Sequence, residues 1–292
     1  MLRAPRAASR GEPDGHASGP AESRDVEASC RVGSAPLNHA RDADPPKDVR
    51  TLKLTVAYDG TRFVGWQRQS EGASVQGVLK DVLGRFEAGP VTVHGAGRTD
   101  AGVHALRQVA STRVSFSLDA ATLTRALNAQ LPDDIRIVSV EEAAADFHAR
   151  YSARSKTYRY QIRNTPTASP FERYWVWHVP ERLDVPAMNV AAGALVGTHD
   201  FVAFRSSGTE VSSTVRTMFE SVWRDSDGFL TYEVSGNGFL RHMVRAIVGT
   251  LVEVGRGWRA ADMTPLLRGG TRAQAGATAP PHGLILAHVD YD

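Results

Sequence analysis

The chain has 292 residues, a formal net charge of +2 and a hydrophobic share of 42%, which fit one or two globular domains. Its single cysteine, Cys30, excludes disulfides and a thiolate metal site, and no apolar run of about 18 residues could span a membrane. The sequence therefore predicts a soluble, cytoplasmic protein. Arginine supplies 30 of the 34 basic residues and suits phosphate contacts, but GC-rich codons produce the same excess, so composition does not establish RNA binding.

The first fifty residues differ in composition from the rest of the chain. They contain no Phe, Trp, Tyr or Ile and are rich in Pro, Gly, Ala, Ser and mixed charge. Such a segment cannot bury enough apolar area to offset its ordering entropy, so we expect residues 1–50 to form a disordered tail. It has no signal-peptide core, its acidic residues argue against a transit peptide, and a mis-assigned start codon is an alternative. Two folded halves are expected over 51–150 and 151–292.

The first half contains alternating strand and helix patterns. Apolar residues at every second position from Leu52 to Tyr58 predict a strand, and Asp59-Gly60 predicts a turn after it. Ser74 can cap a helix that Gly89-Pro90 ends. Further strands are predicted over 90–94, 107–116 and 135–140, and a second helix over 119–131.

The second half has a similar series of patterns. Strands are predicted over 156–162, 175–178, 215–224, 229–235 and 283–291, and helices over 185–195 and 238–254. The run Asp225-Ser226-Asp227-Gly228 predicts a hairpin turn. His199 and Asp200 are adjacent but offer no convergent ligand set, so we expect no metal site there. Together the patterns predict an α+β fold of two similar halves, with helices over mainly antiparallel sheets.

One glycine-rich turn, Gly95 to Ala105, carries a carboxylate that could do chemistry. Asp100 lies between glycines and two residues after Arg98, and the glycines permit backbone angles closed to other residues. In extended backbone the two side chains leave the same side, and a cation that close favours the charged carboxylate, as a nucleophile or electrostatic catalyst. A structural turn with a surface salt bridge fits the isolated pattern equally well.

The predicted strand over 156–162 has two chemically different faces. Tyr158, Tyr160 and Ile162 share one face, and Arg159 and Arg163 share the other. A half-buried core with a solvated arginine face is one interpretation. A stacking platform for an unpaired base beside phosphate-binding arginines is the other.

Arg245 interrupts the apolar side of the last predicted helix. It lies roughly 20° from Val252 and roughly 60° from Val248 around the helix axis, so we expect it to be at least partly buried. A buried guanidinium needs an anionic partner, and Asp100 is the natural candidate for a bidentate pair. An arginine that extends from the edge of an ordinary amphipathic helix to solvent is the alternative.

Three stretches taken together resemble the tRNA pseudouridine synthase A family: Tyr58 to Gln69, Gly95 to Ala105, and Asn237 to Arg245. The resemblance extends over about Leu52 to Tyr291 and implies a pseudouridine synthase catalytic fold. It implies that Asp100 is the nucleophile, that Tyr158 stacks on or orients the base, that Arg245 pairs with Asp100, and that Arg98 contacts the displaced strand or helps to eject the base. The residues implied or expected to contact the substrate are Tyr158, Leu284, Arg241, Gln67, Arg68 and His104.

The same resemblance implies an activity. It points to isomerisation of uridine to pseudouridine at positions 38, 39 and 40 of the tRNA anticodon stem-loop, by a homodimer and without cofactor or metal. The sequence contains no P-loop, Rossmann fingerprint or serine nucleophile elbow. Two alternatives stay open: a non-catalytic RNA-binding protein with the same basic, aromatic surface, and a nucleoside or glycoside hydrolase built on Asp100, which would usually need a second carboxylate.

Overall fold

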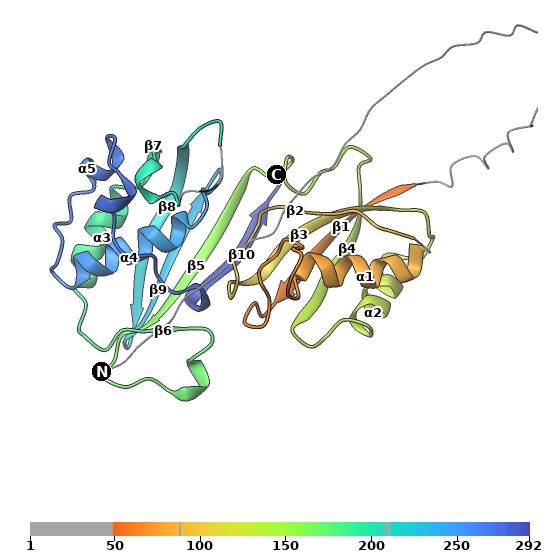
Figure 1. Ribbon diagram of the computed structural model, residues 1–292, viewed down its shortest axis with the longest axis horizontal. Helices are drawn as coiled ribbons and strands as arrows, with labels where there is room; N and C mark the ends of the chain where they lie inside the picture. The colour runs from red at the N-terminus through yellow and green to blue at the C-terminus, as the bar shows by residue number, and fades with distance from the viewer. Residues whose placement is uncertain (1–48, 88, 207, 209–210) are drawn as a thin grey trace, which may run out of the picture. The chain divides into compact units, whose positions relative to one another are not determined.

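The computed structural model describes residues 49–87, 89–206, 208 and 211–292 (Figure 1). The predicted disordered tail, apart from its last two residues, and Cys30 lie outside these residues. Within them, no helix is both long and apolar enough to cross a membrane.

The strands of the described chain form one mixed sheet in the order β4-β1-β3-β10-β5-β9-β8-β7, with β2 beside β3 and β6 beside β5. Their bounds are β1 Arg50–Tyr58, β2 Val93–Gly95, β3 His104–Val114, β4 Ile135–Ala143, β5 Ser155–Arg163, β6 Trp177–His178, β7 Gly197–Asp200, β8 Val215–Ser226, β9 Phe229–Gly236 and β10 Leu284–Asp290. Among these pairs only β3 with β10 and β5 with β6 are parallel, so the predicted α+β fold with mainly antiparallel pairing is confirmed.

The C-terminal strand joins the two predicted halves. β10 lies between β3 and β5, pairing Ile285 with His104 on one side and Leu286 with Tyr158 on the other. The halves therefore share a single sheet, and residues far apart in sequence meet at its centre.

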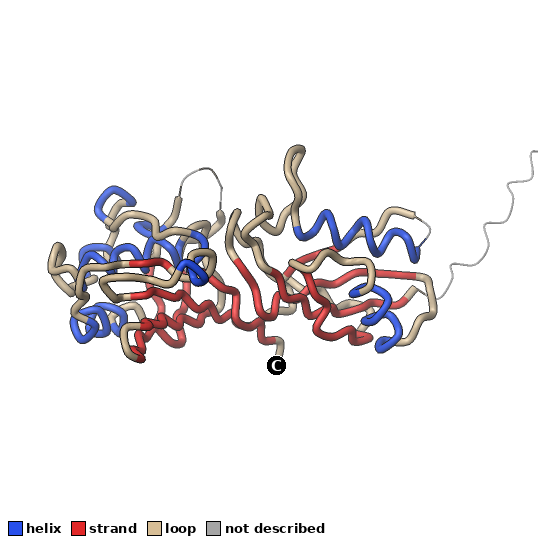
Figure 2. The backbone as a smooth tube through the Cα atoms, turned by 90° about the horizontal axis from the view of Figure 1, so that it is seen from below, coloured by secondary structure: helices blue, strands red, loops and turns tan. Residues whose placement is uncertain are grey.

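Five α-helices accompany the sheet in the described residues: α1 Val75–Glu87, α2 Ala120–Asn128, α3 Val185–Gly193, α4 Met243–Gly255 and α5 Thr264–Leu267. Short 3-10 turns occur at Pro170–Glu172, Val202–Phe204, Arg272–Gln274 and Pro281–Gly283. The predicted cap is present, because the Ser74 hydroxyl accepts from the Gly77 amide at 3.2 Å. The structure adds a second cap, in which the Asp119 carboxylate accepts from the Thr122 amide at 2.9 Å at the start of α2. Figure 2 shows α1 lying along one side of the strand layer.

The core follows the alternation seen in the sequence. Leu52, Leu54, Val56 and Tyr58 of β1 are all buried. In the other half α4 is almost entirely internal, with eleven of its thirteen residues buried, so this helix is the centre of the C-terminal core.

Two turns decide where neighbouring elements begin. The hairpin between β8 and β9 turns at Asp227 and Gly228, whose φ angles of 51° and 75° are those that a two-residue hairpin turn requires, as predicted. The prediction that the last helix begins at residue 238 is wrong by five residues. His242 has a φ of 60°, a left-handed conformation that an α-helix does not accommodate, so α4 begins at Met243.

Candidate active site

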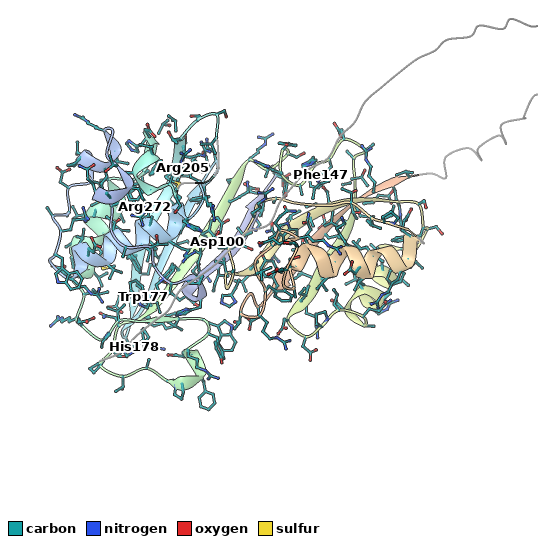
Figure 3. The ribbon with its side chains drawn as sticks, in the orientation of Figure 1. Asp100, Phe147, Trp177, His178, Arg205 and Arg272 are labelled. Atoms are coloured by element: carbon teal, nitrogen blue, oxygen red, sulfur yellow. The ribbon has the colours of Figure 1, made fainter. Side chains whose placement is uncertain are left out.

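The turn that carries Asp100 connects β2 to β3 and lies at the centre of the sheet (Figure 3). The Asp100 carbonyl accepts from the Val103 amide at 3.1 Å, and the Thr99 carbonyl accepts from the Trp66 amide at 3.1 Å. The buried Thr99 hydroxyl contacts the Tyr58 hydroxyl at 2.8 Å. Both flanks of Asp100 are therefore anchored to the core, and its carboxylate, 30% exposed, is held at the edge of solvent.

The glycines of this turn have different reasons for being glycine. Gly102 has a φ of 75°, so the expected special backbone angle occurs there. Gly95 does not have a positive φ; a Cβ on it would lie 2.4 Å from the Trp66 indole, so packing requires it to be glycine. At Gly97 a Cβ would make only ordinary contacts, the nearest at 3.5 Å to Lys156. The prediction of special angles at Gly95 and Gly97 was wrong.

The first turn of α4 provides the cation that contacts the carboxylate. Arg245 Nη1 lies 3.0 Å from Asp100 Oδ2, and its guanidinium, 14% exposed, also donates from Nε to the Ala279 carbonyl at 2.8 Å. The predicted pair is present but it is not bidentate: Nη1 alone contacts the carboxylate, while Nε fixes the arginine to the backbone. Since Arg245 is the third residue of α4, the carboxylate also lies near the positive end of the helix dipole.

Tyr158 of β5 presents an aromatic ring to the same region. Its side chain is 7% exposed and packs edge-on against Phe239, with ring centroids 5.0 Å apart. Burial raises the pKa of Tyr158 well above its ordinary value, and the charges of Tyr58 and Asp100 raise it further, so the phenol stays protonated. Leu284, 5% exposed, begins the adjacent strand β10.

Other residues expected to meet a substrate are at least partly exposed. Arg98 is exposed and donates to Gln67 Oε1 at 3.2 Å, so it turns towards that side chain and not towards Asp100 as expected. Gln67 in turn donates to Gln76 at 2.6 Å, and Arg68 pairs with Asp81 at 3.2 Å. Arg241 is exposed and lies directly before His242.

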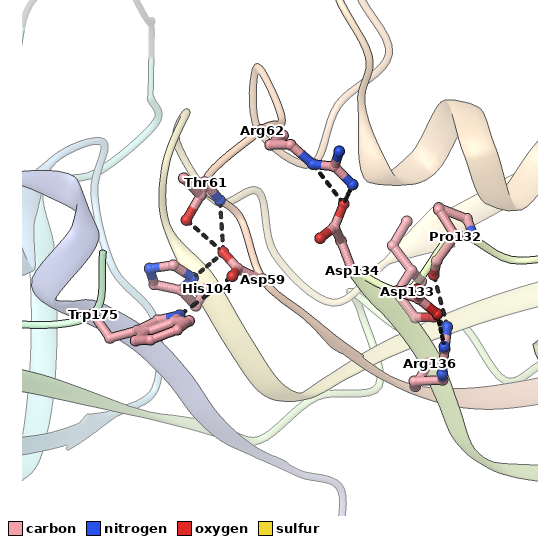
Figure 4. A network of polar contacts seen from close by, with 10 residues as sticks. Asp59, Thr61, Arg62, His104, Pro132, Asp133, Asp134, Arg136 and Trp175 are labelled. Atoms are coloured by element: carbon pink, nitrogen blue, oxygen red, sulfur yellow. Dashed lines mark hydrogen bonds and ion pairs between the residues drawn. The ribbon is translucent and has the colours of Figure 1, made fainter. Parts of the chain in front are cut away.

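His104 does not lie open to a substrate. Its side chain is 4% exposed, Nδ1 accepts from the Gly60 amide at 3.0 Å, and Nε2 lies 2.9 Å from the Tyr174 carbonyl. Figure 4 shows His104 beside Asp59 and Trp175. Asp59 Oδ1 is also 3.1 Å from Nδ1, but the amide contact assigns the ring proton to Nε2, so we treat Asp59 as a neighbour and not as an ion-pair partner. The geometry gives His104 structural contacts on both ring nitrogens, and its expected substrate contact stays a prediction.

The two faces of β5 fit the first interpretation of this strand, in which one face packs in the core and the other carries arginines. Tyr160 and Ile162 are fully buried. Arg159 lies 3.3 Å from Glu233 and Arg163 lies 2.5 Å from Glu172, so both arginines have carboxylate partners within the fold. Within the described part of the chain, no three His, Cys, Asp or Glu residues cluster as metal ligands would.

Two residues near Asp100 were not singled out in the sequence. Phe239 supports Tyr158, and His242 lies with Nε2 3.5 Å from Asp100 Oδ1. Their positions follow from the irregular segment before α4, which was predicted to be helical. The cluster as a whole is an accessible carboxylate that a cation orients, beside a protonated aromatic side chain.

Comparison of the sequence with known protein families gives the class of protein to which this chain belongs. A family model described as tRNA pseudouridine synthase matches residues 54–152 and 191–292, which include Asp100 and Arg245, while Tyr158 lies between the two matched segments.

Comparison with individual proteins identifies the family within that class. The chain is 44% identical to tRNA pseudouridine synthase A of Exiguobacterium sp. over 84% of this chain and 99% of that protein. It is 46% identical to the proteins of the same name from Solibacter usitatus and Syntrophotalea carbinolica, in each case over 83% of this chain and over 100% and 97% of the relatives. The chain therefore belongs to the tRNA pseudouridine synthase A family.

Proposed function

We propose that this protein isomerises uridine to pseudouridine in tRNA, at positions 38, 39 and 40 of the anticodon stem-loop, with Asp100 as the catalytic carboxylate. The observation that carries the proposal is the contact of Asp100 with Arg245 at 3.0 Å beside Tyr158, in a chain of this family. Isomerisation breaks the N1–C1′ bond, lets the uracil rotate, forms a C5–C1′ bond, removes the C5 proton and adds one to N1. Substrate and product have the same atoms, so the reaction needs no external reagent.

Each residue has a task that its position supports. Asp100 attacks C1′ or assists elimination to a glycal, and Arg245 holds Oδ2 and so fixes the orientation of the carboxylate. Tyr158, protonated at physiological pH, contacts or orients the flipped base and does not serve as a phenolate base. Leu284 lines the base pocket with it.

The substrate has to be presented with its uridine flipped out of the stem-loop, at a cost of about a few kcal/mol of unstacking. We assign Arg98 and Arg241, both exposed, to the displaced strand and the phosphates, and Gln67 and Arg68 to the adjoining loop. A homodimer would present one tRNA to surfaces of both subunits.

The decisive experiment is Asp100→Asn, assayed by tritium release from C5-labelled uridine in tRNA. We expect turnover to fall by at least about 10³-fold with tRNA affinity changed by less than about threefold, because loss of a covalent nucleophile removes the chemical step and not the binding surface. The matched control is Asp133→Asn, which changes an almost fully exposed carboxylate paired with Arg136 and should keep full activity.

The outcomes separate the proposal from its alternatives. A non-catalytic RNA-binding protein would show salt-dependent tRNA affinity without tritium release in the wild type. A hydrolase would release free uracil. Either result, or near wild-type turnover by Asp100→Asn, would contradict the proposed function.

A further inference from the structure

His242 occupies a strained position directly before α4. Its φ of 60° and ψ of 5° are left-handed, and among the described non-glycine residues only Asp227, in the hairpin turn, shares a positive φ. Left-handed backbone is unfavourable for a histidine by about 1–3 kcal/mol and persists where the surroundings enforce it, often at functional sites. The imidazole of this strained residue lies beside the carboxylate of Asp100, which is proposed to react.

The imidazole bridges two polar groups. Nδ1 lies 2.8 Å from the Ser206 hydroxyl, and Ser206 is itself fixed because its amide donates to the Arg241 carbonyl at 3.2 Å. Nε2 lies 3.5 Å from Asp100 Oδ1. If the serine hydroxyl donates to Nδ1, the ring proton is on Nε2 and points at the carboxylate.

Four charged groups act on this imidazole. Burial lowers the pKa of His242 below its ordinary value, Asp100 acts in the opposite direction, and Arg245, Arg241 and Arg272 each lower the pKa further. The ring is therefore neutral at pH 7 and carries one proton. With the proton on Nε2, Asp100 would have a permanent cation at Oδ2 and a neutral N–H facing Oδ1, and no second full positive charge beside it.

We propose that neutral His242 is a positioning residue for the isomerisation proposed above, orienting Oδ1 of Asp100 through Nε2–H while Ser206 fixes the tautomer and Arg245 holds Oδ2. The distance of 3.5 Å exceeds that of a formed N–H···O bond, and the contact closes when substrate binds, as catalytic contacts commonly do. Protonation of His242 would place a second cation on the carboxylate and make it a weaker nucleophile and base. Activity should therefore fall as the pH drops below the ordinary histidine value of about 6.5.

Three variants test this in the full-length protein. His242→Ala should lower kcat by about 10- to 100-fold with little change in the KM for tRNA, because a positioning contact acts on the chemical step. His242→Gln restores a neutral N–H donor and should recover most of the rate while losing the acid limb of the pH profile. Ser206→Ala should lower kcat by a smaller factor of about three to ten, because the tautomer is no longer fixed. His288→Ala, an exposed histidine on β10, is the control.

A spectroscopic readout separates this inference from the proposed function. In imidazole NMR spectra, the resonance missing from His242→Gln identifies His242 among the ten histidines. It should show the Nε2–H tautomer and a pKa below about 6.5, and Asp100→Asn should lower that pKa further because the anion that raises it is lost.

Each outcome has a clear meaning. An active wild type with unchanged His242→Ala kinetics, or a His242 titration that Asp100→Asn does not move, overturns the positioning role alone. A wild type that titrates as expected but releases no tritium overturns the proposed function and, with it, this role in catalysis. If His242→Ala fails to fold, the pH profile of His242→Gln decides, and an unchanged acid limb overturns the role.

Discussion

Arg245 and Asp100 are 145 positions apart in the sequence, yet Nη1 of the arginine lies 3.0 Å from Oδ2 of the aspartate. The contact exists because β10 inserts between β3 and β5 and so joins the two halves in one sheet. The start of α4, from one half, then meets the β2–β3 turn of the other. The guanidinium is shared: one nitrogen holds the carboxylate and another holds the Ala279 carbonyl. The cation is therefore fixed by the backbone before any substrate arrives.

Arg245→Lys should reduce catalysis more than stability. A lysine can supply the charge to Asp100 but cannot also donate to Ala279 in the planar geometry of a guanidinium, so the carboxylate loses its fixed orientation. We expect kcat/KM to fall by about 10- to 100-fold, equivalent to the loss of one charged hydrogen bond in the transition state. Urea unfolding should show a loss of less than about 2 kcal/mol.

Arg256→Lys is the matched control for that prediction. Arg256 follows the same helix α4 and pairs with Glu181 at 3.0 Å, but it lies at the other end, away from Asp100. It should keep wild-type kcat/KM. Equal activity of Arg245→Lys and the wild type would show that Arg245 only packs against the turn.

Tyr158→Phe should act on the rate and leave the fold intact. No described residue hydrogen-bonds the Tyr158 hydroxyl, so it is available to substrate, and its removal leaves no protein partner unpaired. We expect kcat to fall by about 10- to 100-fold, the scale for losing a hydrogen bond from the protonated phenol that orients the base, with unchanged unfolding free energy. Because burial raises the pKa of Tyr158, no loss of activity from its ionisation should occur near pH 10.

Tyr232→Phe is the matched control and should change stability instead of the rate. Tyr232 lies on the neighbouring strand β9, and its buried hydroxyl contacts the Ser221 hydroxyl at 2.7 Å. Its loss should reduce stability by about 1 kcal/mol and leave kcat unchanged. Were the two variants to behave alike, the Tyr158 hydroxyl would have no special part in the reaction.

The sequence predicted the elements of this fold better than their contacts. Period-two and period-3.6 patterns located the strands and helices, and Ser74 and Asp119 cap helices as side chains of their type do. The Arg245–Asp100 pair followed from the cost of burying a guanidinium. The strain at His242 and the orientation of Arg98 towards Gln67 could not be predicted, because tertiary contacts decide both.

Gly95→Ala should destabilise the turn although its φ is ordinary. A methyl group would lie 2.4 Å from the indole of Trp66, a side chain only 1% exposed that has no room to move. We expect a loss of about 1–3 kcal/mol in urea unfolding, typical of overpacking, together with lower activity because the adjacent Asp100 turn shifts. Gly89→Ala is the control, since a Cβ there would meet nothing within 4 Å. Equal stability of the two variants would refute the packing argument.

His104→Ala tests whether this residue supports the fold or contacts the substrate. Its removal leaves the Gly60 amide and the Tyr174 carbonyl without their partner in a buried site, which should destabilise the protein by about 2–4 kcal/mol. His178→Ala changes an exposed histidine whose ring contacts the Thr165 carbonyl, and it should cost less than about 0.5 kcal/mol. The KM for tRNA of the folded His104→Ala enzyme should stay within about threefold of the wild type, because the ring faces protein on both nitrogens and adds no binding energy. A large rise in KM with unchanged stability would restore the substrate contact that the sequence suggested.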